Sequence, residues 1–113
     1  MTPGKLRVYS ALAQGYMALG RATRTQGPYQ AAERVILRAV RIHERPEQRR
    51  DLACAAYERG DFALALAELA RAEALQPDRP DCLVLKGYAL IRSGRTREGE
   101  AALARAHMLY SAP

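Results

Sequence analysis

The sequence has no tryptophan and only one phenylalanine among its 113 residues, although 49% of the residues are hydrophobic. A core without large aromatic rings must be assembled mainly from alanine and leucine. Such side chains suit helices that approach one another closely, and they fill the thick interior of a β-sandwich or barrel poorly. The composition therefore predicts an all-α protein, and the length is enough for one domain.

Cysteine is also scarce. The two cysteines, Cys54 and Cys82, lie 28 residues apart and form no C-x-x-C pair. This spacing favours small buried or groove-lining residues in a reducing compartment over a disulfide or a metal site. The sequence also lacks a long apolar run and an N-terminal leader that joins a basic region to an apolar one. We therefore expect a soluble cytoplasmic protein without a membrane span.

Acidic residues are few in the first half of the chain. Residues 1–50 hold ten lysines and arginines against three acids, whereas residues 51–113 hold eight against nine. The net charge of +6 therefore comes from a basic first half, and this asymmetry bears on the partners of the protein.

Small and large residues recur with a regular period along the chain. Gly27, Gly60 and Gly94 are separated by 33 and 34 residues. Nine positions after each glycine stands a large aliphatic residue: Ile36, Leu69 and Leu103. Twelve positions after each glycine stands an alanine: Ala39, Ala72 and Ala106. The small residues recur where one helix must approach another closely. An ordinary bundle of alanine and leucine helices has no reason to keep such a period.

The pattern resembles the tetratricopeptide repeat, a pair of helices with a W-x2-L-G-x2-Y pattern, an A-x3-F pattern and a closing proline. Matches run through residues 13–45, 46–79 and 80–113. Local departures are Arg49 at the usual tryptophan, Lys86 at the usual leucine, and Glu44 and Ser111 at the closing proline. The resemblance implies an all-α, three-repeat helical-hairpin solenoid of six helices, forming one domain over residues 1–113.

The helices are expected at residues 5–25, 29–43, 46–59, 62–75, 80–93 and 96–110. Pro28 and Pro46 suit the first turns of helices, because proline lacks the N–H group that a first turn leaves unpaired. Residues 1–12 precede the first repeat and are expected to extend its first helix.

In this family the first helix of each repeat lines a concave groove. The positions that face this groove imply a floor of Met17, Cys54, Tyr57, Val84, Tyr88 and Ile91, with arginines at the edges: Arg21, Arg24, Arg50 and Arg92. The remaining two groove positions are Thr25 and Glu58. An exposed apolar strip with a polar rim is typical of a binding site, and we expect it to hold an amphipathic helix or an extended apolar segment. Any one of these residues, taken singly, can instead complete the core.

A basic clamp for acidic chain termini, which related repeats use to bind heat-shock chaperones, is missing. That clamp needs lysine, asparagine and arginine, but this sequence has Asp51 and Asp81 among the corresponding positions, together with Met17, Arg21 and Leu85. The two carboxylates would repel a terminal carboxylate.

The end of the array is a second candidate surface. Arrays of this kind usually finish with an extra helix whose outer face is polar. Here only about three residues follow the last expected helix, near Met108, Leu109 and Tyr110. We expect a partner segment or a second copy to cover that end, giving a hetero- or homodimer.

Four arginines form a basic stripe along the second helix: Arg34, Arg38, Arg41 and Arg45. A solvated convex face explains such a stripe most simply. The alternative is that the stripe binds an acidic protein, a nucleic acid or a membrane surface. No nucleic-acid fold signature or aromatic stacking platform accompanies it, so nucleic acid is the less favoured partner.

Motifs for catalysis and metal binding are missing. His43 and His107 have no cysteine or carboxylate at a metal-ligand spacing. No Ser/His/Asp or Cys/His pair has a suitable local context. The segment "RSGRTREG" at residues 92–99 is explained as an interhelix turn. We therefore expect a protein that is not an enzyme and needs no cofactor.

A compact three-repeat protein of this length also resembles the small tetratricopeptide chaperones of bacterial type III secretion systems. The resemblance covers length, repeat number and the segments "RGDFALALAEL" (59–69) and "REGEAALARAHMLY" (97–110). It implies a cytosolic bacterial protein in a heterodimer with a secreted subunit, either the early export substrate X or the needle subunit. The alternative function is an electrostatic binder of nucleic acid or an anionic surface through the basic N-terminal half.

Overall fold

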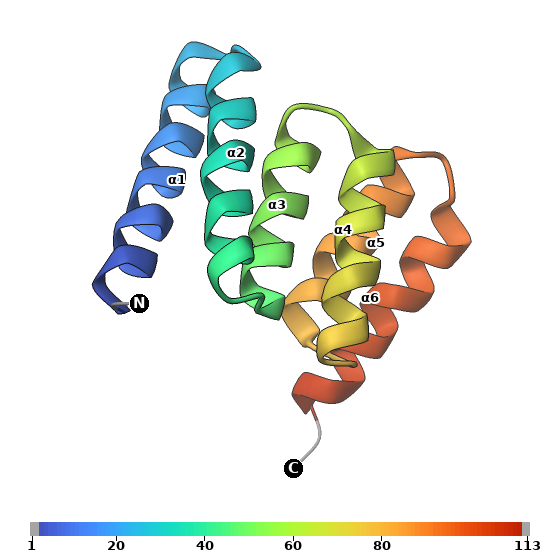
Figure 1. Cartoon of the computed structure of the whole chain (residues 1–113). Coiled ribbons are helices and arrows are strands. Elements are labelled where there is room, and N and C mark those ends of the chain that lie inside the picture. The colour runs from blue at the N-terminus through green and yellow to red at the C-terminus, as the bar shows by residue number, and fades with distance from the viewer. Residues whose placement is uncertain (1–2, 112–113) are drawn as a thin grey trace.

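The computed structural model describes residues 3–111 and is all-helical over that range (Figure 1). Its six helices are α1 (Pro3–Thr23), α2 (Gly27–Ile42), α3 (Pro46–Glu58), α4 (Phe62–Leu75), α5 (Pro80–Arg92) and α6 (Thr96–Ser111). The predicted all-α class and the number of helices are thus confirmed. Helix α4 has the predicted bounds, and every other boundary lies within about two residues of its prediction, the usual scatter at helix ends.

Helix α1 ends earlier than predicted because the chain turns at Arg24. This residue has a φ of 55°, in the left-handed region, and its N–H group donates to the Gly20 carbonyl oxygen at 2.8 Å. The hydrogen bond closes the last turn of the helix. Arg24 and Thr25 therefore lie beyond α1 rather than within it.

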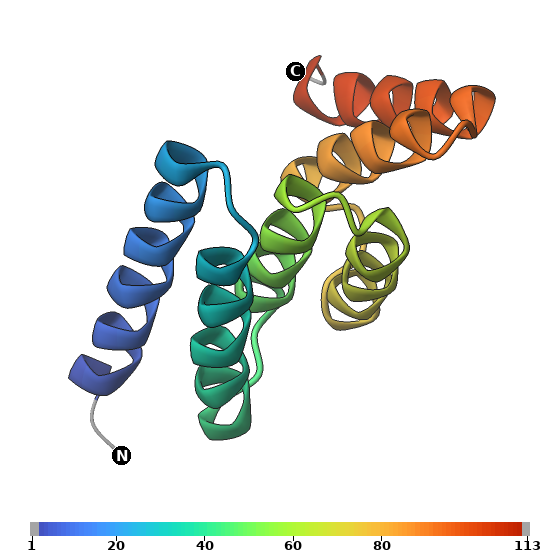
Figure 2. The same ribbon diagram turned by 90° about the horizontal axis from the view of Figure 1, so that it is seen from above.

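Each odd-numbered helix packs along the even-numbered helix that follows it, and α2 and α4 also contact the first helix of the next pair. Helix α3 additionally contacts α5. Figures 1 and 2 show α1 at one end of this row and α6 at the other, with α5 and α6 turned relative to the first four helices. The molecule measures 38 × 32 × 22 Å.

Glycines stand where two helices approach most closely. A methyl carbon placed on Gly99 of α6 would lie 2.8 Å from the Gly87 carbonyl oxygen of α5 and 2.6 Å from Cγ1 of Ile91. A methyl carbon on Gly87 would lie 2.7 Å from Cγ of Leu103. The space beside Gly20 of α1 is similarly occupied by the Tyr29 ring of α2. A larger residue at any of these positions would force the helices apart.

Two of the three periodic glycines serve the turns within helix pairs. Gly60 and Gly94 have φ angles of 89° and 85°, a left-handed conformation that glycine adopts without steric cost. After the first of these turns, the Asp61 side chain accepts a hydrogen bond from the Leu64 N–H group and caps α4. Gly27 differs, because it lies in the first turn of α2 and carries no left-handed φ.

The core consists of two apolar clusters that meet in α3. One cluster joins Met17 of α1, Ile36 of α2 and Leu52 of α3. The other joins Ala53 of α3, Leu69 of α4 and Cys82 of α5, among others. Helix α3 is buried on two sides by these clusters, so it positions the helices before and after it.

Arg49 of α3 forms a partly buried ion pair. The guanidinium group donates to Glu68 of α4 at 2.9 Å and to Glu44 at 2.7 Å. Glu68 is 4% exposed and also accepts a hydrogen bond from Arg71. The carboxylate has a partner for each oxygen, as a buried charge requires.

We expect Gly99→Ala to destabilise the protein by about 1–3 kcal/mol, because the added methyl group overpacks the contact between α5 and α6. Gly15→Ala is the matched control. Gly15 lies inside α1 with no heavy atom within 4 Å of its placed methyl carbon. The control should therefore stabilise the isolated chain by about 0.5–1 kcal/mol. Urea unfolding of both variants measures the difference, and equal shifts would contradict this account of the packing.

Candidate partner-binding groove

Helices α1 and α3 border two open hollows along the side where the groove was predicted. The larger hollow, of about 730 Å³, lies between the start of α1 and the start of α3 and includes Arg7, Ser10 and Asp51 in its lining. The smaller, of about 310 Å³, lies at the other end of the same helices and includes Arg21, Arg24 and Thr25. Both are open to solvent and lined largely by polar groups.

An ion pair in the lining of the smaller hollow joins α1 to α3. Nε of Arg21 lies 2.5 Å from Oε1 of Glu58. The Cys54 thiol lies one turn before Glu58, with its Sγ atom 3.8 Å from Oε2. Burial, reinforced by the Glu58 charge, raises the pKa of the Cys54 thiol to about 11. This thiol is therefore protonated and weakly nucleophilic at neutral pH.

Two further contacts join α3 to α5. The Arg92 guanidinium lies over the rings of Tyr57 and Phe62, at 5.9 Å and 5.3 Å from their centroids. Nε of Arg50 lies 3.4 Å from a carboxylate oxygen of Asp81, a charge contact whose geometry is too poor for a hydrogen bond. Arg50 and Arg92 thus tie neighbouring helices together as well as edging the groove.

Carboxylates occupy the starts of α3 and α5. Burial raises the pKa of Asp51. The charge of Arg50 opposes this rise, and the charges of Glu47 and Asp81 add to it. Partial burial also acts to raise the pKa of Asp81, but hydrogen bonds from Arg79 outweigh it and hold the pKa below its ordinary value. Both carboxylates are paired with arginines, Asp51 with Arg50 and Asp81 with Arg79 and Arg50.

The exposed apolar part of the predicted groove lies on α5. Tyr88 is 48% exposed and Ile91 is 36% exposed, while Val84 is partly buried one turn earlier. Ile91 also packs against Gly99 of α6. Of the large apolar side chains on α5, Tyr88 is therefore the most accessible to a partner.

Met17 does not belong to the groove, which corrects the sequence prediction. Its side chain is 2% exposed and packs in the core cluster with Tyr29, Ile36 and Leu52. The long, flexible thioether reaches into the gap between α1, α2 and α3. The α1 side of the groove therefore consists of polar residues, and the apolar floor is confined to α3 and α5.

Sequence reasoning missed the part played by Phe62. Its ring packs against Tyr57 with a centroid distance of 5.5 Å and lies under Arg92. Its place as the aromatic residue of the second interhelix turn was the signal that could have drawn attention to it. The first residue of α4 thus packs against two of the predicted groove residues, Tyr57 and Arg92.

The structure also places the other two predicted surfaces. Arg34, Arg38 and Arg41 are exposed on α2, but Arg45 lies beyond the helix as the residue before α3, so the stripe holds three arginines. At the end of α6, Met108 is 64% exposed and Tyr110 is 70% exposed, while Leu109 is partly buried. The other large residues exposed on α6 are polar, including Arg97, Glu100 and His107.

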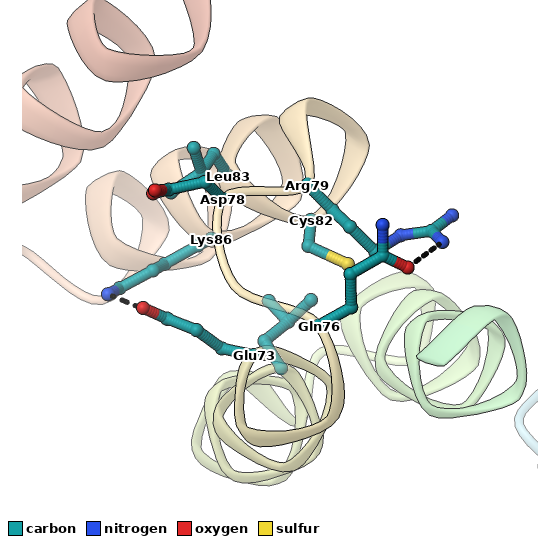
Figure 3. Close-up of a pocket in the computed structure, with 8 residues that line it drawn as sticks. Glu73, Gln76, Asp78, Arg79, Cys82, Leu83 and Lys86 are labelled. Atoms are coloured by element: carbon teal, nitrogen blue, oxygen red, sulfur yellow. Dashed lines mark hydrogen bonds and ion pairs between the residues drawn. The ribbon is translucent and has the colours of Figure 1, made fainter. Parts of the chain in front are cut away.

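Figure 3 shows a small hollow beside α5, bordered by Glu73 of α4 and by Arg79, Cys82 and Lys86. Its volume is about 10 Å³, space for a single water molecule and too small for an organic ligand. Within residues 3–111 the structure contains no cluster of three or more potential metal ligands. None of the helices described is long and apolar enough to cross a membrane.

Comparison with family models and with curated proteins found no match to this chain.

We expect alkylation of Cys54 to be about a hundredfold slower at pH 8 than that of a thiol with the ordinary pKa, because so little of it is thiolate. The rate should rise about tenfold for each pH unit until the pH approaches about 11. Iodoacetamide modification of a Cys82→Ala variant, followed by mass spectrometry, measures this profile. A rate that levels off near pH 9 would show that burial and Glu58 do not raise the pKa of the thiol.

Proposed function

We propose that this protein is a three-repeat tetratricopeptide adaptor or chaperone that holds an apolar or amphipathic helical segment of a protein partner in the groove. The proposal includes no enzymatic activity. It rests on the agreement between the residue period and the helix pairs. Pro46 and Pro80 begin the first helices of two successive pairs, and Gly60 and Gly94 make the same left-handed turn within them.

The exposure of Tyr88 beside Ile91 and Val84 is the observation that carries the binding role. Tyrosine supplies a large contact area while losing little side-chain entropy, and for this reason it is common at interfaces. Arg50 and Arg92 border these residues with charged groups already held by Asp81, Tyr57 and Phe62. A partner helix can bury its apolar face on α5 and pair its polar flanks with this rim.

Type III secretion is the cellular setting that the sequence resemblance suggests. In that setting the protein would be a bacterial cytosolic chaperone, and the partner a secreted subunit whose exposed helix needs cover before export. The confinement of the apolar floor to α3 and α5 suits a short helical segment. Co-purification from the native cells, followed by mass spectrometry, identifies the partner.

An electrostatic binder remains the second candidate, and one observation favours it. Of the eight lysines and arginines in residues 3–45, only Arg21 has an ion-pair partner among the residues described. A salt titration separates the two functions. Affinity for an apolar helix should change little between low and moderate salt, whereas affinity for a polyanion should fall steeply, because phosphate binding releases counterions.

We expect Tyr88→Glu to abolish partner co-purification while leaving the melting temperature nearly unchanged, because the side chain is half exposed. Leu75→Glu is the matched control, since it places the same charge on a similarly exposed apolar residue of α4, outside the groove, and should retain the partner. Capture that survives Tyr88→Glu would refute the proposed groove. Ile91→Glu is a poorer test, because Ile91 also packs against Gly99 and its loss would destabilise the fold.

A further inference from the structure

Helix α1 carries an apolar stripe along the face that α2 does not cover. Val8, Leu12 and Leu19 are 62%, 44% and 49% exposed, and Gly15 and Ala22 continue the same face at helical spacing. The opposite face of α1 packs in the core through Ala13 and Met17. We call the five residues Val8, Leu12, Gly15, Leu19 and Ala22 the α1 stripe.

The stripe is distinct from the other exposed apolar residues. Leu37 and Leu75 stand singly on α2 and α4, and Tyr88 and Ile91 belong to the proposed groove. On α1, by contrast, three exposed aliphatic residues align along nearly the whole length of one helix. Figure 1 shows α1 at the end of the row, with α2 beside it. Such a continuous apolar face is typical of a helix that packs against a partner helix.

Gly15 leaves open space at the middle of the stripe, where a second helix could approach. Glycine inside a helix is less stable than alanine. Gly20, Gly87 and Gly99 are required by their surroundings, because a methyl carbon at each would lie less than 3.0 Å from a neighbouring atom. Gly15 has no atom within 4 Å of its placed methyl carbon, so nothing in the described chain needs it. A partner helix crossing α1 at this point would need it.

The charge around the stripe determines which partner fits. Helix α1 contains Lys5, Arg7 and Arg21 and no acidic residue. Lys5 precedes Leu12 by seven residues, and Leu12 precedes Leu19 by seven, so the three lie nearly in line along α1. On the adjacent α2, Arg34, Arg38 and Arg41 are exposed, and no acidic side chain among residues 3–111 lies within ion-pair distance of them. A second copy of α1 would therefore bring cations against cations, at a cost in free energy.

We propose that the α1 stripe docks an amphipathic helix of a different protein, whose apolar face is flanked by aspartate and glutamate. The apolar residues supply the buried contact, and Gly15 lets the two helix backbones approach. Lys5 and Arg7 pair with the acidic flanks and orient the incoming helix, because opposite charges along the edges of a helix pair select both partner and direction. This surface is separate from the groove on α5.

The test uses two designed helical peptides of about 20 residues with leucines at the a and d positions. One carries glutamates at the flanking e and g positions and the other carries lysines there. We expect the glutamate peptide to bind the full chain and the lysine peptide not to bind, measured by fluorescence anisotropy. Raising the salt concentration should weaken the binding without abolishing it, because the apolar contact persists.

Leu12→Asp should weaken binding of the glutamate peptide by about tenfold or more, because it places a charge in the buried contact. Leu75→Asp is the matched control, since Leu75 is 43% exposed and the substitution is the same. This variant should bind the glutamate peptide as tightly as the unaltered chain does. Gly15→Leu should also block docking, although leucine favours the helix and the chain should fold at least as well. Tyr88→Glu should leave this binding unchanged, which separates the stripe from the groove.

Three outcomes overturn the proposal. One is equal binding of both peptides, or of neither. Another is self-association of the chain in sedimentation that Leu12→Asp removes, which would make the occupant a second copy. The third is binding of the chain to vesicles of equal phosphatidylcholine and phosphatidylserine, with no binding of the glutamate peptide, which would make the stripe a membrane contact.

Discussion

The close approach of helix backbones at small residues is the constraint on which the rest of this structure depends. A chain without tryptophan cannot fill wide gaps between helices, so it gains contact area by shortening the distance between them. Gly99 and Gly87 show the limit of this approach, because even one methyl group at either site would meet a neighbour. Ile91 and Leu103 then fill the space around them. The position of Tyr88 on α5 follows from this packing.

The sequence predicts most of the fold, because helix boundaries depend on local chemistry. Pro46 and Pro80 mark helix starts, and Asp61 marks the start of α4 with a side-chain cap. The end of α1 was less predictable. Arg24 adopts the left-handed conformation there, and an arginine gives no sign of it where a glycine would. The repeat period located the glycines, but it could not distinguish the turn at Gly60 from the helical position of Gly27.

The groove was harder to predict, because its surface depends on the directions of long side chains. A position in a repeat fixes where a Cα atom lies, but a flexible side chain can still turn inwards, as Met17 does. The arginines show the same limitation. Arg92 was expected at the edge of the groove, yet its guanidinium lies over Tyr57 and Phe62 and joins α5 to α3. Such contacts depend on rotamers that only the packed neighbours select.

The distribution of ion pairs gives the charge asymmetry a physical meaning. In the second half of the chain most cations have partners, including Arg59 with Glu33, Arg79 with Glu47 and Arg105 with Asp78. Ion pairs at a surface add little stability, so their scarcity in α1 and α2 costs the fold almost nothing. Unpaired surface cations do, however, raise the rate and selectivity of association with an acidic partner. The proposed recognition of an acidic partner would give the basic half a role that the stability of the fold does not require.

Binding at the two proposed surfaces would be linked through α1. This helix packs mainly against α2, and its ion pair from Arg21 to Glu58 reaches α3, which forms the middle of the groove. A partner on the outer face of α1 would stabilise the helix by mass action, because it binds only the folded form. The Arg21–Glu58 contact, and with it the polar wall of the groove, would then be held more often in place. Because an exposed ion pair adds little free energy, the coupling between the two surfaces would be small, and thermodynamic reciprocity would make it equal in both directions.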